Sequence, residues 1–496
     1  MSRELDRLAD SVLLPGFVGA APPDWVRARV AEGLGGVVLF ARNVRSAEQL
    51  AALTGALKAE RPDVLVAIDE EGGDVTRLDA ATGSSVPGPL ALGAVDDVAL
   101  TRSVAAALGR RLAGVGVTVD LAPVADVNSN PDNPVIGVRS FGADPALVAR
   151  HVRAAVEGLQ AAGVAACAKH FPGHGDTAVD SHRGLPVAGG DLTEALLPFR
   201  AALEAGVQAV MTGHLLVPGC GSLPATVNPA LIDGVLRDEL GYRGVVISDG
   251  IDMAAVAATF GLAETAVRAL LAGVDAICVG GGPADEATAL RLRAALVDAV
   301  HAGRLPERRL VEAAGRLAGL ARWTAGRGAR TRDGSPDGSA AEGPAGEDPA
   351  EAAARIGLAA ARRAVHTRGV VRLPAGAAPV LVELDPPPNI AAGRSGWGLS
   401  TVLPERLPGT SVCRVGPDDS LPRPARDRPL VVVTRSATRF RWQRTALDRL
   451  LADRPDAVVV EMGVAGAAPA DRYVQTFGAS RASAIAAAEA LLGPSP

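Results

Sequence analysis

The segment KHFPGHGDTAVDSH, residues 169–182, concentrates side chains that can move protons and hold polar ligands. It contains three of the seven histidines and one of the two lysines of the chain. Asp180 and His182 lie two residues apart, and a carboxylate beside an imidazole fixes its tautomer and raises its basicity. The pair could therefore act as a general acid and base near neutral pH.

A metal site is the alternative chemistry for the same segment. Pro172 and the two glycines that follow it break any helix after His170. His170 and His174 therefore do not form the i, i+4 ligand pair of a helical zinc site, although loop residues could still supply ligands. Lys169 argues against this, because its ammonium group would be repelled by a divalent cation. The sequence predicts no metal and no other cofactor.

Other polar residues stand where short apolar runs stop. Asp69 closes the run VLVAID, Lys169 and His170 close AACAKH, His214 lies in AVMTGHLL and Asp249 lies in VVISDG. A single polar residue at the end of a strand is usually part of a turn. In a (β/α)8 enzyme, however, the carboxyl ends of the strands carry the active site. The recurrence over several runs predicts that one face of a sheet collects these side chains.

The N-terminal part alternates short β-branched runs with stretches rich in Ala, Leu and Arg at helical spacing. This alternation predicts an α/β fold with a parallel sheet, and eight runs predict a closed (β/α)8 barrel of the TIM type over residues 1–324. An open, doubly wound sheet is the alternative. One connecting helix is expected over residues 191–206, with Asp191 and Glu194 at its start. The expected strands are residues 11–17, 35–40, 64–69, 118–124, 165–170, 209–216, 245–250 and 277–282.

Residues 325–356 are rich in Gly, Pro, Ser and charge and show no apolar periodicity, so they are expected to form a flexible linker. Residues 357–496 then return to apolar runs and helical stretches. This pattern predicts a smaller, layered α/β sandwich domain, and none of its residues indicates catalysis. The expected strands there are residues 378–384, 429–435 and 456–463, and the expected helices are residues 439–454 and 479–493.

Composition favours a small-molecule partner. The net charge is only −5 and the acidic and basic residues are interspersed, so no patch for nucleic acid or for an anionic membrane is expected. No apolar run approaches the about 18 residues of a spanning helix, and the N-terminus lacks the apolar core of a signal peptide. The four cysteines are far apart in sequence, which fits reduced thiols and a cytoplasmic location.

Four motifs carry a resemblance to a known family. The order of these motifs along the chain is typical of family 3 glycoside hydrolases. In chain order they are DEEGGDVTRL (69–78), VIGVRSF (135–141), KHFPGHGDTAVDSH (169–182) and VVISDGIDM (245–253). The histidine-bearing segment is similar to that of the NagZ-type β-N-acetylglucosaminidases within this family. The C-terminal domain resembles, more weakly, the α/β sandwich of the two-domain members.

The resemblance implies a retaining mechanism and a role for each motif residue. Asp249 matches the nucleophile, His182 matches the acid/base and Asp180 matches the residue that orients it. A set of five residues matches those that hold the sugar hydroxyls and the N-acetyl group, and His214 is expected to join the pocket. The five are Asp69, Arg77, Arg139, Lys169 and His170.

The expected activity is exo-hydrolysis of terminal β-linked N-acetylglucosamine from small glycosides, such as muropeptide or chitin fragments. A phosphorylase is the alternative, because a histidine acid/base adds no negative charge that would repel phosphate. A sugar-binding protein without activity and a metal-dependent hydrolase are further alternatives. The second motif usually reads DQEGGRV, and Glu70 and Asp74 here replace its glutamine and arginine. These changes are expected to reverse a charge near the pocket rim.

Overall fold

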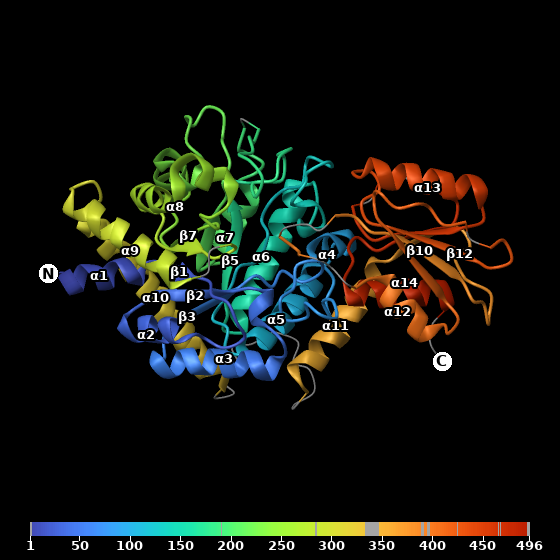
Figure 1. Cartoon of the computed structure of the whole chain (residues 1–496), viewed down its shortest axis with the longest axis horizontal. Coiled ribbons are helices and arrows are strands. Elements are labelled where there is room, and N and C mark those ends of the chain that lie inside the picture. The colour runs from blue at the N-terminus through green and yellow to red at the C-terminus, as the bar shows by residue number, and fades with distance from the viewer. Residues whose placement is uncertain are drawn as a thin grey trace.

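The structure, a computed structural model, extends along one axis as two parts that lie side by side (Figure 1). It describes residues 2–189, 191–282, 285–332, 347–387, 391–393, 397–423, 425–464, 466 and 468–493. The N-terminal part, coloured blue to yellow in Figure 1, contains a curled parallel sheet. The C-terminal part, coloured orange to red, contains a second sheet.

The curled sheet has sequential strand order. Strands β2 to β7 pair in turn, β1 pairs with β8, and Ile247 of β7 bridges Ala276 just before β8. Gly35 lies against the carbonyl oxygens of Ser11 and Leu13, so the starts of β1 and β2 are neighbours too. A doubly wound sheet would instead reverse its order at one point. Among the described residues the strands are β1 (Leu13–Pro15), β2 (Gly36–Leu39), β3 (Leu65–Ile68), β4 (Val119–Asp120), β5 (Ala165–Phe171), β6 (Ala209–Thr212), β7 (Val245–Ser248) and β8 (Ile277–Val279).

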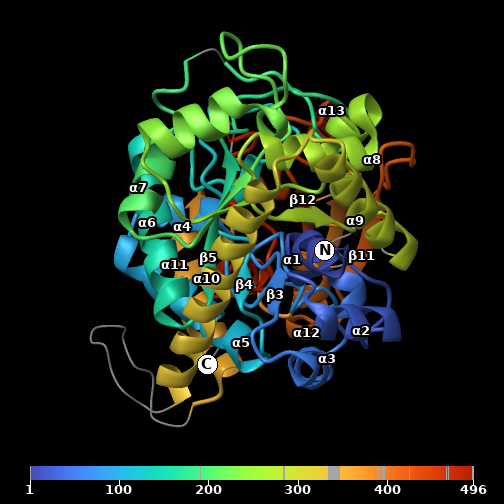
Figure 2. The ribbon, with the colours of Figure 1, turned by 90° about the vertical axis from the view of Figure 1, so that its left-hand side faces the viewer.

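Each of the expected N-terminal runs overlaps one of these strands, and only β5 extends past its run, by one residue, to Phe171. Helices surround the sheet in end view (Figure 2). Helix α10 covers the interior of the curl, where its Leu317 and Leu320 join the same apolar cluster as Leu14 and Leu65 of the strands. The α-helices described in this part are α1 (Ser2–Ser11), α2 (Asp24–Glu32), α3 (Ala47–Glu60), α4 (Pro89–Val95), α5 (Val98–Gly114), α6 (Pro145–Ala161), α7 (Leu197–Glu204), α8 (Ala254–Leu271), α9 (Glu286–His301) and α10 (Glu307–Arg332). A π-helical segment, Ala230–Glu239, precedes β7.

Side chains along each strand alternate between the two faces of the sheet. In β5, Ala165 and Cys167 belong to the apolar cluster inside the curl, whereas Ala166 and Ala168 pack outward against the helices. Residue 169 continues the inward series. The lysine at this position therefore points into the interior at the carboxyl end of the strand.

The helix expected over residues 191–206 begins later than predicted. Helix α7 starts at Leu197, with Pro198 in its first turn, where proline is tolerated because its missing N–H has no helical partner to lose. Asp191 does not cap the helix; its carboxylate accepts a hydrogen bond from the backbone N–H of Thr193 at 2.9 Å in the preceding turn.

Among the described residues, one helix has the length and composition of a membrane span, although none was expected. This helix is α8, and its backbone leaves helical geometry at Gly261, with φ 71° and ψ 162°. Its C-terminal half buries Ala266, Val267 and Leu270 in the N-terminal core. A helix packed into the core of a globular protein can have the same length and apolar composition as a membrane span.

The expected linker is wrong at both ends. Helix α10 continues to Arg332, and helix α11 (Pro349–Ala364) begins well before residue 356. Asp348 caps α11 by accepting a hydrogen bond from the backbone N–H of Ala350 at 2.9 Å. The rest of the expected linker, residues 333–346, lies outside the described residues.

The second sheet has helices on both faces. Its described strands follow the order β11-β10-β12-β13-β14-β9, and only the β14–β9 pair is antiparallel. Helices α12 and α14 share an apolar cluster with one face, and α13 packs on the other. The bounds are β9 (His366–Arg368), β10 (Val380–Leu384), α12 (Leu399–Arg406), β11 (Ser411–Val415), β12 (Leu430–Thr434), α13 (Arg441–Asp453), β13 (Val458–Glu461), β14 (Tyr473–Gln475) and α14 (Arg481–Leu492). Each of the five expected elements contains one of these.

Helix α11 and polar contacts join the two parts. Gly357 of α11 lies so close to Ser85 that a Cβ atom would come within 2.2 Å of the serine carbonyl oxygen. Asp74 accepts a hydrogen bond from the backbone N–H of Ala479 at 2.9 Å. The carboxyl ends of the curled sheet thus face the C-terminal part.

Candidate active site

A cavity of about 640 Å³ opens at the carboxyl ends of the curled strands. Asp69 follows β3, Lys169 lies in β5 and Asp249 follows β7. Each continues the inward alternation of its strand, after Ala67, Cys167 and Ile247 respectively, which are part of the interior cluster. Seven of the nine predicted site residues line this cavity: Asp69, Arg77, Arg139, Lys169, His170, His182 and Asp249.

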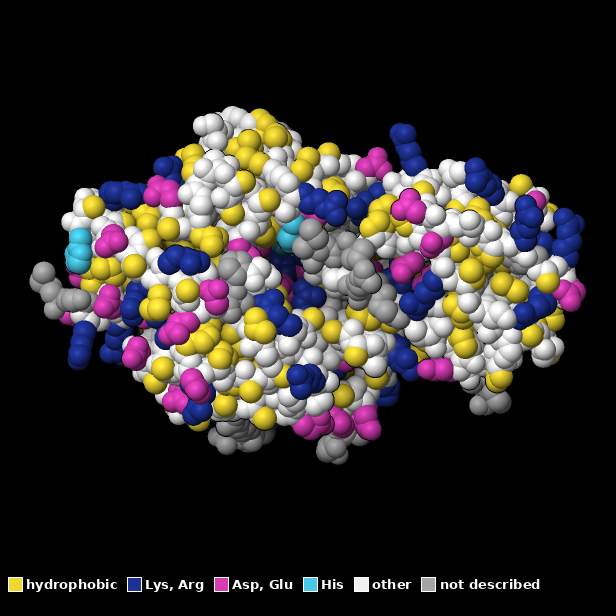
Figure 3. Space-filling view, in the orientation of Figure 1, with side chains coloured by type: hydrophobic (Ala, Val, Ile, Leu, Met, Phe, Trp, Pro, Cys, Tyr) yellow, Lys and Arg dark blue, Asp and Glu magenta, His cyan; other side chains and the backbone are white. Residues whose placement is uncertain are grey.

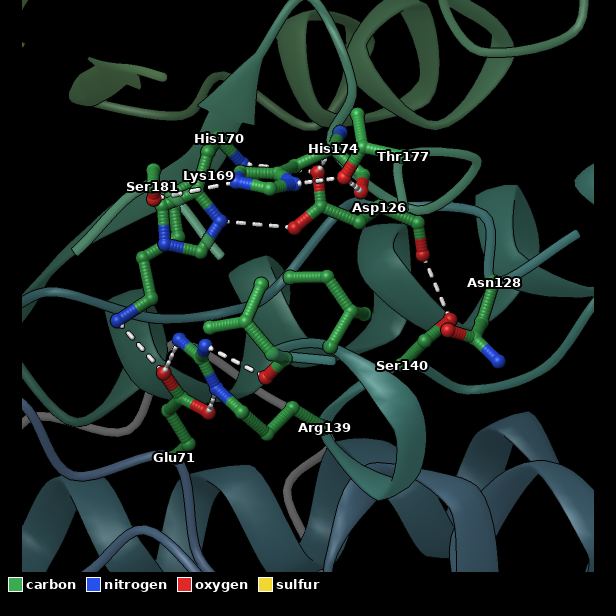
Figure 4. Close-up of polar contacts among 12 residues, drawn as sticks. Glu71, Asp126, Asn128, Arg139, Ser140, Lys169, His170, His174, Thr177 and Ser181 are labelled. Carbon is green, nitrogen blue, oxygen red and sulfur yellow. Dashed lines mark hydrogen bonds and ion pairs between the residues drawn. The ribbon is translucent and has the colours of Figure 1, made fainter. Parts of the chain in front are cut away.

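Lys169 is the centre of a buried ion network (Figure 4). Its Nζ lies 2.7 Å from Oδ1 of Asp69 and 2.7 Å from Oε1 of Glu71. Arg139 forms two hydrogen bonds to Glu71, at 2.7 and 2.9 Å. Burial alone would lower the pKa of Lys169, but Asp69 and Glu71 raise it above its usual range. Burial also opposes ionisation of Glu71, yet Arg139 and Lys169 hold its pKa far below normal. Lys169 and Glu71 are therefore both charged at neutral pH.

Asp249 is ionised for a related reason. Burial alone would raise its pKa, but the facing histidines His214, His170 and His182 lower it to about 2. Its Oδ1 also accepts a hydrogen bond from the backbone N–H of Gly250 at 2.7 Å. A carboxylate that stays unprotonated while it lines a cavity can attack an electrophilic carbon.

The predicted Asp180–His182 pair is present in the structure. Nδ1 of His182 lies 2.8 Å from Oδ1 of Asp180, and His182 extends into the cavity. Burial would raise the pKa of Asp180, but its hydrogen bonds to the ring and to the backbone N–H of His182 lower it. The carboxylate therefore fixes Nδ1 as the protonated nitrogen, which leaves Nε2 to exchange a proton inside the cavity.

Asp126, which sequence reasoning missed, holds the histidine-rich segment in place. Its Oδ2 lies 2.8 Å from Nδ1 of His170, and its Oδ1 accepts the backbone N–H of His174 at 2.7 Å (Figure 4). His174 in turn contacts Thr177 and Ser181 through its two ring nitrogens, at 2.6 and 3.2 Å. Burial lowers the pKa of His174. His174 therefore ties the start of the loop to the residue that precedes His182.

His214 does not lie where it was expected. It is fully buried, and its Nε2 donates to the carbonyl oxygen of Gly250 at 2.9 Å. Its Nδ1 lies 2.7 Å from Oγ1 of Thr226. Both nitrogens are therefore used by the protein, and burial lowers the pKa of the ring. His214 does not line the cavity. It bonds to the backbone of Gly250, the residue after Asp249, and so supports the segment that carries this carboxylate.

The C-terminal part completes one wall of the cavity. Ala391, Ala392 and Gly393 line it, and the carbonyl oxygen of Ala391 accepts a hydrogen bond from Nη2 of Arg77 at 2.8 Å. The same nitrogen of Arg77 lies 3.8 Å from Asp69. Arg42 and Asp252, which sequence reasoning missed, also line the cavity.

Neither residue of the expected charge change lines this cavity. Glu70 is fully buried beneath the cavity, where its Oε2 accepts the backbone N–H groups of Arg77 and Leu78 at 2.7 and 2.8 Å. Burial, followed by the charge of Asp79, raises the pKa of Glu70 to about 7. Asp74 is occupied by its contact with Ala479. Glu70 therefore supports the backbone of its own motif, and Asp74 joins the two parts of the chain.

Among the described residues, no group of three or more His, Cys, Asp or Glu side chains has the arrangement of a metal site. His170 and His174, the residues considered for a loop site, are each bonded to protein partners. The cavity brings together a carboxylate that can act as a nucleophile and an imidazole that can transfer a proton.

Comparisons with known proteins give consistent results. The glycosyl hydrolase family 3 N-terminal domain matches residues 20–320. Beta-hexosaminidase A of Pseudoalteromonas piscicida is 36% identical over 330 residues, which are 60% of this chain and 55% of that protein. A beta-hexosaminidase of Alkalilimnicola ehrlichii is 39% identical over 324 residues, covering 62% of this chain and 91% of that one. The chain therefore spans only about half the length of the first relative and nearly all of the second.

A solved structure matches almost the whole chain. It is a glycoside hydrolase family 3 beta-N-acetylglucosaminidase from Paenibacillus sp. str. FPU-7, with 31% sequence identity and a TM-score of 0.83. The match covers 99% of this chain and 96% of that chain. Both the curled sheet and the second sheet are therefore shared with that protein.

Proposed function

The chain belongs to glycosyl hydrolase family 3, since the family domain matches residues 20–320, and we propose that it is a retaining exo-β-N-acetylglucosaminidase. One observation carries the proposal. An ionised carboxylate, Asp249, and an imidazole supported by a carboxylate, His182 with Asp180, serve the same cavity at the ends of the curled strands. The names of the relatives and of the structural neighbour support the same activity.

In the first step, Asp249 attacks the anomeric carbon and forms a covalent glycosyl ester. The bond to the leaving oxygen breaks as Nε2 of His182 donates its proton to that oxygen. In the second step, the now neutral His182 removes a proton from water, and the water oxygen displaces Asp249. The sugar leaves with the β configuration that it had in the substrate, and the enzyme regains its starting protonation state.

The remaining predicted residues bind the sugar in this proposal. Lys169, Asp69, Arg77 and Arg139 present charged groups of fixed orientation to hydroxyl and amide groups, and His170 is oriented by Asp126. Because the ion network is buried and internally bonded, it costs little reorganisation when a substrate binds. No cofactor takes part.

The eight strands form a closed (β/α)8 barrel in this proposal, and the second sheet belongs to a smaller α/β sandwich domain that follows helix α11. The sequential strand order and the contact of Gly35 with Ser11 and Leu13 support closure. The separate apolar clusters on the two faces of the second sheet support the sandwich. The substrates are small glycosides such as muropeptide or chitin fragments, handled in the cytoplasm without nucleic-acid or membrane partners.

Phosphate is the alternative acceptor. The proton-transferring group is a histidine, so the acid/base itself brings no negative charge against an anionic acceptor. A phosphorylase would release the sugar as a 1-phosphate in the second step.

The decisive experiment compares an aryl N-acetyl-β-glucosaminide with the matching aryl β-glucoside, each with and without inorganic phosphate. The proposal expects much faster turnover of the N-acetyl substrate and release of free sugar in both buffers. Preference for the glucoside would refute the N-acetylglucosaminidase. Sugar 1-phosphate as the main product would replace the hydrolase with the phosphorylase.

A further inference from the structure

A second cavity, of about 1100 Å³, lies between the barrel and the C-terminal domain. Ile136, Arg139, Ala392 and Gly393 line both this cavity and the sugar cavity, so the two are adjoining spaces. Asp180 of the acid/base pair faces the interdomain cavity. In the space-filling view, dark-blue Lys and Arg side chains lie beside a histidine at the hollow between the two parts (Figure 3).

One of the cations that line the interdomain cavity, Arg439, comes from the C-terminal domain and contacts the barrel. Its Nη2 donates to the carbonyl oxygen of Pro134 at 2.7 Å. Burial lowers the pKa of Arg439, while the negative charges of Asp180 and Asp132 act against that shift. The guanidinium group therefore contacts the barrel loop that contains Pro134, and it lines the same cavity as Asp180, the carboxylate that orients His182.

The position of Arg439 is fixed from within its own domain. Residues 436–439 form a turn in which the backbone N–H of Arg439 donates to the carbonyl oxygen of Ser436 at 2.9 Å. Glu461 of β13 accepts the backbone N–H groups of Ser436 and Ala437, at 2.6 and 3.1 Å. The Arg439 guanidinium also lies 4.7 Å from the centre of the Phe440 ring. A buried carboxylate and an aromatic ring thus hold the turn that carries this side chain.

On the barrel side, the contacted loop is bonded to the acid/base loop. Nδ2 of Asn133, the residue before Pro134, donates to the carbonyl oxygens of His174 and Thr177, at 2.8 and 3.0 Å. A hydrogen-bonded route therefore runs from Arg439 through the Asn133–Pro134 segment to the start of the loop that carries His182. Asp180, at the other end of that loop, lines the same cavity as Arg439.

We infer that Arg439 is a positioning residue through which the C-terminal domain holds the Asp180–His182 pair in its productive place. The inference rests on the proposed function, because it assigns His182 the protonation of the leaving oxygen. Arg439 acts through the loop and does not itself contact the reacting atoms. Displacement of an acid/base by about 1 Å is enough to cost on the order of a hundredfold in rate.

The test uses the full chain and two substrates that differ in their need for protonation. The β-linked N-acetylglucosamine disaccharide has a poor leaving group, and the 4-nitrophenyl N-acetyl-β-glucosaminide has a good one. Arg439→Gln is expected to lower kcat/KM for the disaccharide about tenfold or more and to spare kcat/KM for the nitrophenyl substrate, because this ratio reports only the first step, in which His182 acts as the acid. Arg439→Lys, which keeps the charge, is expected to recover part of the loss. Arg441→Gln is the matched control, because Arg441 is exposed at the start of α13.

Three outcomes would overturn the inference while leaving the proposed function intact. They are unchanged rates in Arg439→Gln, equal slowing of both substrates, and an equal effect of Arg441→Gln. If Arg439→Gln does not fold, Arg439→Lys must show the same selective loss for the disaccharide, and equal slowing of both substrates by this variant again refutes the inference. Failure of the proposed function is distinguishable, since the unmodified enzyme would then lack activity on both substrates.

Discussion

Oδ1 of Asp180 accepts two hydrogen bonds from His182, one from its backbone N–H at 2.9 Å and one from ring Nδ1 at 2.8 Å. One carboxylate oxygen therefore fixes both the backbone and the ring of the same residue. Because the two residues are only two positions apart, the pair moves as a unit when the loop moves. The bond to Nδ1 leaves Nε2 as the ring nitrogen that is open to the cavity.

His182→Ala is expected to slow substrates with poor leaving groups by about a hundredfold or more and activated aryl glycosides far less, since only the former need protonation of the departing oxygen. The measurement is kcat/KM over a series of aryl leaving groups of different acidity. Equal slowing across the series would mean that the loop positions the substrate and donates no proton.

Asp180→Asn is expected to give a milder form of the same defect. The substitution removes the negative charge that supports the imidazolium form of the ring. The basic limb of the kcat profile should therefore move to lower pH. An unchanged profile would separate Asp180 from the proton transfer.

Asp249→Ala is expected to lower kcat by at least about a thousandfold without loss of the fold, because the carboxylate lines a cavity and is not part of the packed core. A 2-fluoro glycoside should label Asp249 in the unmodified enzyme, as peptide mass spectrometry would detect. Label on any other carboxylate would contradict the assignment.

Lys169→Met is expected to weaken both sugar binding and stability. The substitution leaves Asp69 and Glu71 without their shared ammonium group, and loss of one partner from a buried ion network costs about 3–5 kcal/mol. Chemical denaturation would measure the loss of stability, and titration with N-acetylglucosamine would measure binding. A variant as stable as the unmodified protein would show that the ion network is not a supporting element.

Glu70→Gln is expected to remove a pH-dependent loss of stability. The pKa of Glu70 rises from 4.5 to about 7 on folding, so the folded state holds a proton that the unfolded state has released between these values. Stability should therefore fall as pH rises from about 4.5 to 7, by about 3 kcal/mol. Glutamine can still accept the hydrogen bonds from Arg77 and Leu78. The Tm of the variant should match that of the parent near pH 4 and exceed it at pH 8.

The sequence predicted the chemistry of the strand ends because of a simple geometric rule. Lys169 follows Ala165 and Cys167 at intervals of two, so a strand ending there sends it to the interior. Sequence reasoning missed Glu71 and Asp126. Glu71 lies two residues after Asp69, the polar residue that follows β3. Asp126 lies two residues after the expected strand 118–124, which ends without a polar residue. Their roles depend on partners 68 and 44 residues away, Arg139 and His170.

His214 shows the opposite error. The rule for strand ends favoured it as a cavity residue, but residues past the strand no longer follow the alternation, and this ring turns toward Thr226 and Gly250. The linker was misjudged for another reason. Its Gly, Pro and charge content hid the ends of two helices, and α11 is stabilised by close packing at Gly357 that no local pattern reveals.

The hydrogen bond from Arg77 to the carbonyl oxygen of Ala391 means that removal of the C-terminal part would alter the cavity. The boundary between the N-terminal and C-terminal parts runs along the cavity, because residues of both parts line it. The N-terminal part alone would therefore lack one wall of the cavity. A chain cut after α10 would keep every residue of the proposed chemistry. It would also free the Arg77 guanidinium from its fixed direction, and it would remove α11, whose Ala353 and Ala360 belong to the apolar cluster of the N-terminal part.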